Sequence, residues 1–159
     1  MIKQIVTLTL LAVCSVAVIG CQDSEPAPLT SEDIDAIRTM SSEWMSAAAE
    51  GNWDDVVATY TDDAVLWFNG NPIEGKEAIR DFFEQMPPMT GMDLIIDDVY
   101  GRGDLAVISG HSTQLIDGEV VTSGRYLDTR LRQPDGSWLF HRDMVTHFLA
   151  PPFVNDASE

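Results

Sequence analysis

Residues able to exchange protons gather late in the chain, on two segments that we expect to be β-strands. Because side chains alternate along a strand, Tyr126, Asp128 and Arg130 share one face of the first segment. The same rule places His141 and Asp143 on one face of the second segment. If both faces line one cavity, Asp128, His141 and Asp143 are the candidates for acid/base catalysis, because burial and neighbouring charges shift pKa values.

A structural role is the alternative for the same cluster. Arg130 could form an ion pair with Asp128 or Asp143 across the strands. His141 could then be satisfied inside that network. Ion-pair networks also shift pKa values, so the residue types leave both interpretations open.

No metal or cofactor is expected. His141, Asp143 and His147 could form the two-histidine, one-carboxylate face of an open iron site. However, residues six apart on an extended strand lie roughly 20 Å apart, which is too far to share one ion. The sequence also contains no nucleophile elbow, no glycine-rich phosphate loop and no cysteine pair typical of a metal or redox site.

Aromatic side chains could line an apolar pocket beside this cluster, with Met86 and Met89, or could simply fill the core, where such residues dominate. The residues that we expect to bind a ligand are Trp44, Tyr60, Trp67, Phe68, Phe83, Tyr126, Arg130 and Val145. The function that this lining indicates is the binding of a small, largely apolar molecule.

Helices in the first half of the chain and strands in the second must position these residues. Thr30 followed by Asp33 is an N-cap signal, apolar residues then recur at spacings of three and four, and Gly51 ends the helix. The other expected elements are a helix at 53–60, turns at 62–63 and 69–72, a strand at 64–68, a helix at 76–86, and strands at 94–100, 105–116, 119–132 and 137–148. The last three strands should form an antiparallel meander, so the fold class is α+β.

Two motifs in the middle of the chain are similar to those of a known superfamily. YTDDA at 60–64 precedes the short strand, and GKEAIRDFF at 75–83 opens the third helix. They resemble the nuclear transport factor 2-like superfamily, which contains ketosteroid isomerase and the SnoaL-like polyketide cyclases. The resemblance implies three N-terminal helices packed into a curved, mostly antiparallel sheet, which forms a cone with a pocket at its open end.

The resemblance also implies a homodimer that forms through the outer face of the sheet. Alternation along the last strands predicts an apolar outer face that is unfavourable to leave in water. The residues expected on it are Leu127, Thr129, Leu131, Phe140 and Met144.

The comparison with ketosteroid isomerase extends to single positions. The oxyanion tyrosine of that family falls at Trp44, its general base at Phe68, and its second oxyanion donor at Asp128. Because Phe68 cannot accept a proton, no steroid isomerisation by that mechanism is expected. Two alternatives to a binding protein therefore remain: a cofactor-independent acid/base enzyme of the isomerase, dehydratase or cyclase type, and a dimeric interaction domain.

The N-terminus has the features of a bacterial lipoprotein signal. A positively charged start precedes an apolar run at 5–19, which is short for a membrane span. VIGC at 18–21 resembles a lipobox, which implies cleavage before Cys21 and acylation of that cysteine; an ordinary signal peptide or an uncleaved anchor is the alternative. Cys14 would be removed with the signal, so no disulfide is expected.

The expected organisation follows from this signal. It comprises a signal peptide at 1–20, a lipidated cysteine and tether at 21–29, a SnoaL-like domain at 30–150 and a flexible tail at 151–159. The expected location is the bacterial cell envelope, with a lipid anchor in the outer membrane and the domain facing the periplasm.

The chain is strongly acidic. It has 26 aspartates and glutamates against 9 lysines and arginines, a formal net charge of -17. Nucleic acids need a basic surface and are not expected as partners. The acidity favours solubility or a salty habitat, with a ligand-steering field as the alternative. The expected partners are a small apolar ligand, the membrane through the anchor, and a second copy of the chain.

Overall fold

The computed structural model describes residues 25–86, 88–116 and 119–149. Its elements are, in chain order, α1 (Ser31–Glu50), α2 (Trp53–Ala58), β1 (Tyr60–Phe68), β2 (Asn71–Glu74), α3 (Lys76–Glu84), β3 (Met92–Arg102), β4 (Leu105–Ile116), β5 (Glu119–Arg132) and β6 (Trp138–Leu149). One sheet contains the strands in the order β2-β1-β6-β5-β4-β3. β1 runs parallel to β6, and the other neighbouring pairs are antiparallel. The predicted α+β class and the predicted meander of the last three strands are confirmed.

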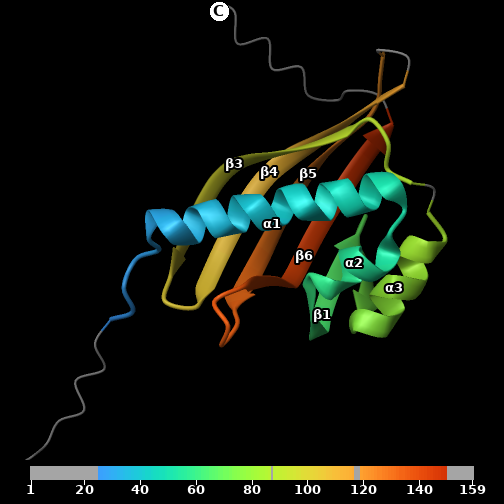
Figure 1. The fold of residues 1–159 in the computed structure, drawn as a ribbon. Helices are drawn as coiled ribbons and strands as arrows, with labels where there is room; N and C mark the ends of the chain where they lie inside the picture. Colours follow the sequence, from blue (N-terminus) through green and yellow to red (C-terminus); the bar gives the residue numbers. More distant parts are fainter. Residues whose placement is uncertain (1–24, 87, 117–118, 150–159) are drawn as a thin grey trace, which may run out of the picture.

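Helix α1 lies across the inner face of the curved sheet (Figure 1). The Thr30 hydroxyl accepts a hydrogen bond from the Asp33 N–H at 3.2 Å, and the Asp33 carboxylate accepts one from the Thr30 N–H at 2.9 Å. Gly51 ends the helix in the left-handed region, with φ 70°. Both helix boundaries therefore agree with the prediction. The apolar side chains that the helix buries are Ile37, Met40, Trp44 and Ala48.

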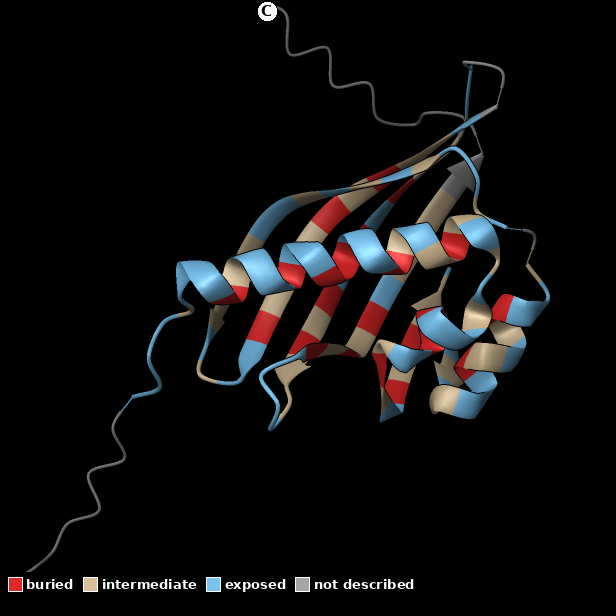
Figure 2. Ribbon diagram, in the orientation of Figure 1, coloured by how far each residue is buried: buried red, intermediate tan, exposed pale blue. Residues whose placement is uncertain are grey.

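The helices and the sheet enclose two apolar clusters. α1 packs against β3 and β6, whereas α2 and α3 pack beside β1, near the end of α1 (Figure 1). Buried positions alternate with exposed ones along the central strands and face α1 (Figure 2). One cluster joins the first half of α1 to β4 and β5, and the other joins its second half to α2, α3, β1 and β6.

The start of the first strand differs from the prediction. α2 ends at Ala58 and β1 begins at Tyr60, so the turn expected at Asp62 and Asp63 is wrong. These residues instead lie inside β1, at the irregularity between its pairs Tyr60–Phe140 and Val65–Arg142 with β6.

The predicted turn after β1 is confirmed and forms a hairpin. Asn69 and Gly70 have φ of 50° and 85°, the two positive values that a tight hairpin turn with right-handed strand twist requires. The short strand β2 that follows was not predicted, because it contains Pro72. Its place at the edge of the sheet explains why a proline is tolerated there.

The segment before α1 is docked rather than free. The Gly103 N–H, in the turn between β3 and β4, donates to the Ala27 carbonyl at 2.8 Å. Arg102 donates to the Pro26 carbonyl at 3.2 Å and pairs with Glu25 at 3.2 Å. Residues 25–27, in the segment expected as a tether, are therefore held against this turn by one backbone hydrogen bond and by the Arg102 side chain. The lipobox, the signal peptide and the tail at 151–159 lie outside the described residues.

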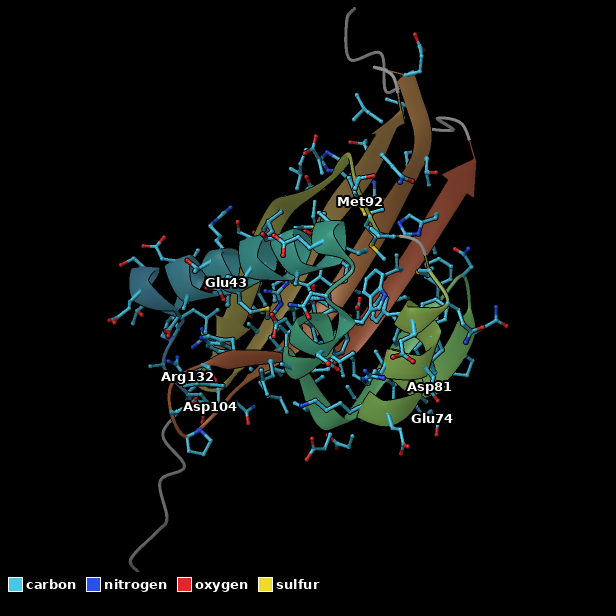
Figure 3. The ribbon with its side chains drawn as sticks, turned by 45° about the vertical axis from the view of Figure 1, so that its right-hand side comes forward. Glu43, Glu74, Asp81, Met92, Asp104 and Arg132 are labelled. Carbon is cyan, nitrogen blue, oxygen red and sulfur yellow. The ribbon has the colours of Figure 1, made fainter. Side chains whose placement is uncertain are left out.

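Ion pairs fasten the start of α1 to the same end of the sheet. Arg132, the last residue of β5, pairs with Asp33 of α1 and with Asp104 at 3.2 Å (Figure 3). Hydrogen bonding from Arg132 holds the pKa of Asp33 well below its usual range. The Arg132 guanidinium also lies 4.7 Å from the centre of the Trp138 ring. Within the described residues, no helix is long and apolar enough to cross a bilayer.

Candidate functional site

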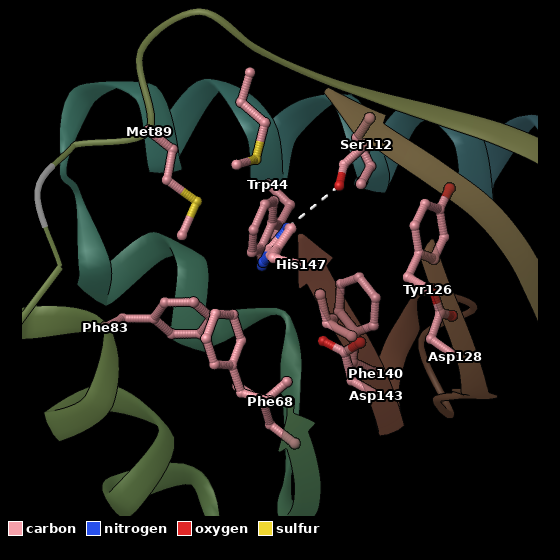
Figure 4. Close-up of a pocket in the computed structure, with 14 residues that line it drawn as sticks. Trp44, Phe68, Phe83, Met89, Ser112, Tyr126, Asp128, Phe140, Asp143 and His147 are labelled. Atoms are coloured by element: carbon pink, nitrogen blue, oxygen red, sulfur yellow. Dashed lines mark hydrogen bonds between the residues drawn. The ribbon is translucent and has the colours of Figure 1, made fainter. Parts of the chain in front are cut away.

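A largely apolar pocket opens between the second half of α1, the segment after α3 and the inner face of β4–β6 (Figure 4). Its volume is about 60 Å³, which is room for roughly four to six water molecules. Its apolar walls are Trp44, Leu66, Phe68, Phe83, Met89, Met92, Leu94, Phe140 and Val145. Its polar lining consists of Ser112, Tyr126, Asp128, Asp143 and His147.

Two carboxyl groups lie side by side at one end of the pocket. Asp128 of β5 and Asp143 of β6 are directly opposite each other in the sheet and are both buried. Asp128 accepts two hydrogen bonds from Arg130, from Nε at 2.9 Å and from a terminal nitrogen at 3.2 Å. Burial raises the pKa of Asp128, and the charge of Arg130 opposes that rise. The ion pair that the sequence offered as the structural alternative is therefore present.

Arg130 belongs to the support beneath the pocket. Its side chain is completely buried. It donates to the Ile37 carbonyl at 2.9 Å, and its guanidinium lies 4.2 Å from the centre of the Phe140 ring. Arg130 thereby joins α1 to the sheet and does not line the pocket, so the prediction that it contacts the ligand is not supported by its position.

Asp143 is the second carboxyl group in the pocket with a raised pKa. Burial and the charge of Asp128 raise its pKa to about 7, while a hydrogen bond from Tyr60 and the charge of Arg130 act in the opposite direction. The Tyr60 hydroxyl donates to Asp143 Oδ2 at 2.8 Å. Since one carboxylate of the pair is already matched by Arg130, the second retains a proton near neutral pH. Asp143 is therefore suited to donate or accept a proton in the pocket.

Tyr60 is the hydrogen-bond partner of Asp143 and lies behind it, outside the pocket lining. Burial, followed by the charge of Asp143, raises the pKa of Tyr60 well above its usual range, so the phenol stays protonated. The neighbouring Trp44 N–H opposes part of this rise, although it is not placed to form a hydrogen bond. Trp44 Nε1 is buried and has no hydrogen-bond partner among the described residues.

His141 does not lie with Asp143, and the prediction that they share a face is wrong. A β-bulge is the reason: Thr129 pairs with Arg142 and Arg130 with Phe140, so His141 is an extra residue in β6. The bulge reverses the alternation, which turns Phe140 inward. His141 instead contacts the Thr61 hydroxyl at 3.1 Å, outside the pocket. Phe140 is likewise removed from the outer face on which it was expected.

Most of the other predicted positions converge. Trp44, Phe68, Phe83, Tyr126 and Val145 line the pocket together with Asp128 and Asp143. Two more do not contact it. Tyr60 is buried beneath Asp143, and Trp67 alternates with the lining residues Leu66 and Phe68 and so has the opposite orientation.

Several lining residues were not expected as ligand contacts. Ser112, on β4, was not singled out at all, and His147 was considered only as a metal ligand. The remaining ones are Leu66, Met89, Met92, Leu94 and Phe140, of which only Met89 had been grouped with the lining. A serine within a strand carries no signal of its own, but Gly124 in the middle of β5 is an unusual strand residue that points to a close approach.

The histidines do not assemble with carboxylates into a metal site. Among the described residues, no three histidine, cysteine, aspartate or glutamate side chains are arranged to hold an ion. The bulge separates the two-histidine, one-carboxylate set considered from the sequence, because His141 faces away from Asp143 and His147.

Three helices packed in a curved, mixed sheet, with a pocket between them, define the class of small cone-shaped α+β proteins. Within that class, the model of the SnoaL-like domain matches residues 42–141. The chain therefore belongs to the SnoaL-like domain family, and its fold is that of the NTF2-like proteins. No curated protein sequence matches it.

Solved structures similar to this chain confirm the fold. A ketosteroid isomerase-like protein from Erwinia carotovora atroseptica has a TM-score of 0.64 and 22% identity, over 77% of this chain and 100% of that one. An NTF-2 like protein of unknown function from Shewanella oneidensis has a TM-score of 0.63 and 16% identity, over 71% and 98%. A cystatin-like fold protein from Burkholderia xenovorans has a TM-score of 0.64 and 22% identity, over 79% and 99%.

Proposed function

We propose that the pocket binds a small, largely apolar molecule carrying a hydrogen-bonding group that reaches Asp143. The observation that carries this proposal is the buried Asp143 carboxyl, with a pKa raised to about 7, at the end of a pocket whose other walls are mostly apolar. Pockets of this composition bind apolar bodies and orient them through a few polar groups.

The size of the pocket limits the ligand. Its volume of about 60 Å³ is less than half of the roughly 150 Å³ of an apolar cavity that binds benzene, so a steroid is far too large and even a single small ring requires the lining to move. Met89 and Met92 supply unbranched, flexible side chains that adjust to the shape of a ligand. Apolar contact contributes about 25 cal/mol for each Å² removed from water, so a ring of this size gains several kcal/mol.

The polar group of the ligand is best described as a carbonyl oxygen. A protonated Asp143 would donate a hydrogen bond to it, and we propose as second donor the Trp44 N–H, which is buried without a hydrogen-bond partner among the described residues. A buried donor without a partner costs about 1–3 kcal/mol, and a ligand acceptor would remove that cost. A ketone on a small ring satisfies both requirements.

Binding of cyclohexanone tests this proposal. We expect saturable binding by calorimetry to the chain from Gln22 onward, which contains every residue that the structure describes. Affinity should fall as pH rises through 7, because Asp143 then loses the donated proton. Trp44→Phe should weaken binding by roughly threefold to tenfold, the value of one hydrogen bond. Trp67→Phe is the matched control and should have no effect. Absence of saturable binding to the wild type contradicts the proposal.

Acid/base catalysis is the second candidate, and the pKa of about 7 at Asp143 favours it. A carboxyl group with such a pKa can remove a proton from the carbon beside a bound carbonyl. Deuterium exchange into cyclohexanone, followed by NMR in heavy water, should then be faster with the wild type than with Asp143→Asn. Equal rates would leave binding as the function. Steroid isomerisation is still not expected, since Phe68 stands where that family has its base.

We further propose that the protein acts in the bacterial envelope, held by a lipid on Cys21 and facing the periplasm. The apolar run at 5–19 and VIGC at 18–21 support this proposal. A single mature cysteine in an exported protein is consistent with modification rather than with a disulfide.

A further inference from the structure

A pair of uncharged polar side chains lies in the pocket, apart from the two carboxyl groups. Ser112 of β4 and His147 of β6 approach each other across the pocket wall, with Ser112 Oγ 3.3 Å from His147 Nε2 (Figure 4). Ser112 is 3% exposed. The pair is two polar side chains in a wall that is otherwise aromatic and aliphatic at this end, formed by Phe68, Met92 and Leu94.

Gly124 makes this contact possible. It lies on β5, between the two strands, and is paired with Ser112 on one side and with His147 on the other. A Cβ at this position would lie 2.6 Å from His147 Cδ2 and 3.1 Å from Ser112 Oγ. A side chain here would therefore separate the pair. Glycine inside an element costs roughly 0.5–1 kcal/mol relative to alanine, so the sequence keeps a locally unfavourable residue where the two groups meet.

The histidine is held in place but keeps hydrogen-bonding capacity. Its backbone N–H donates to Asn69 Oδ1 at 2.8 Å, and its ring packs 5.3 Å from that of Phe68. Burial lowers the pKa of His147, which keeps the imidazole neutral at pH 7. A neutral imidazole has one donor and one acceptor nitrogen, and a serine hydroxyl has one donor and two acceptor sites. The single contact between them leaves at least one donor and one acceptor for a ligand.

The two polar ends are separated along the strands. Asp143 and His147 are four residues apart on the same face of β6, which corresponds to roughly 13 Å between Cα atoms. Tyr126 and Val145 lie between these ends and pair across β5 and β6. A six-membered ring with oxygens on opposite carbons spans roughly 11–12 Å when a hydrogen bond is added at each end. Because both side chains leave the same face of the strand, the spacing of the two Cα atoms is a guide to the spacing of the polar groups, and it is close to the span of a small ring with two opposite polar groups.

We propose that Ser112 and His147 form a second binding site in the pocket, so that its ligand is a small ring with a hydrogen-bonding group at each of two opposite ends. One group faces Asp143 and the other faces the serine–histidine pair. This inference rests on the proposed binding function and adds the class of ligand. The second group is a hydroxyl or an equivalent group, because the pair can both donate and accept.

A pair of matched ligands tests the second site. 4-Hydroxycyclohexanone and 4-methylcyclohexanone have the same size and the same carbonyl, and differ only at the far end. We would measure both by calorimetry at pH 6 with the chain from Gln22 onward. The measured quantity is the affinity for the hydroxyl ligand divided by the affinity for the methyl ligand. This ratio should be roughly fivefold higher in the wild type than in the double variant Ser112→Ala, His147→Phe, since a hydrogen bond contributes about 1 kcal/mol. Ser109→Ala is the control, because Ser109 lies on the outer face of the same strand.

The outcomes separate this inference from the proposed function. If both ketones bind but the ratio is the same in the wild type and the variant, the second site is refuted and the binding function stands. If neither ketone binds the wild type, both proposals are refuted. Should the double variant fail to fold, Ser112→Ala alone gives the answer, because it removes one hydroxyl and must also lower the ratio.

Discussion

The strongest prediction concerns the proton on Asp143. Its pKa is about 7 in the folded protein against an ordinary 3.8, because it is buried next to Asp128. The folded state thus binds this proton more tightly than the unfolded state. The resulting stabilisation is complete below the unfolded pKa and is lost as pH rises through 7. Asp143→Asn should remove this pH dependence, because the amide matches the neutral acid in shape and can still accept from Tyr60.

The expected size follows from the shift. One pKa unit corresponds to about 1.4 kcal/mol, so the Asp143 term falls by about 3 kcal/mol between pH 5 and pH 8. His147 has the opposite effect on stability. Burial lowers its pKa, so its contribution to the free energy of unfolding increases as pH rises towards the pKa of histidine in the unfolded chain. The contribution of His147 is present in both proteins, so it cancels when the free energy of unfolding of the wild type is subtracted from that of the variant. Relative to the wild type, Asp143→Asn should therefore become more stable as pH increases.

Urea unfolding at unit pH steps from 5 to 8 measures this difference. We expect the free energy of unfolding of Asp143→Asn minus that of the wild type to rise by about 3 kcal/mol over this range. Asp62→Asn is the control, because this carboxylate is 98% exposed. A difference that stays flat from pH 5 to 8 would show that Asp143 is ionised in the fold, and would refute the description of the site.

Three further predictions concern other parts of the chain. Arg130→Met leaves Asp128 buried without its partner and should lower the free energy of unfolding, measured in urea, by about 3–5 kcal/mol. Arg125→Met is the control and should lower it by less than about 1 kcal/mol, because the ion pair of Arg125 with Asp97 is exposed. The wild type should incorporate radiolabelled palmitate in cells and Cys21→Ser should not; an unlabelled wild type contradicts the anchor. The adjacent outer-face residues Leu127 and Met144 are each 49% exposed, and we predict that they lie in a dimer interface. Sedimentation at micromolar concentration should show twice the chain mass for the wild type and the mass of a single chain for Leu127→Asp. A monomeric wild type contradicts the dimer.

Local signals predicted much of this fold. The cap at Thr30, the stop at Gly51 and the turn at Gly70 each depend on the backbone preferences of one or two residues, and all three are confirmed. The alternation along β5 also placed Tyr126 and Asp128 correctly on the pocket face, because no bulge interrupts that part of the strand. Where structure follows from neighbouring residues, sequence is sufficient.

Features that depend on register could not be predicted in the same way. The bulge at His141 arises from the pairing of β6 with β5, and one extra residue reverses the face of everything before it. The contact between Ser112 and His147 joins residues 35 positions apart through the pairing of three strands. The strand at Tyr60 likewise depends on a parallel partner late in the chain. Such features require the partner strand to be known.

The docking of residues 25–27 has a geometric consequence for an anchored protein. If Cys21 carries a lipid, the chain from Cys21 to Glu25 reaches at most about 14 Å. The end of the sheet at Gly103, where that segment docks, would then lie against the headgroups. α1 spans 20 residues, or about 30 Å, and Trp44 in its second half and the nearby Met89 line the pocket. With α1 along the membrane normal, the pocket would stand well above the lipid surface and would open to the surrounding water.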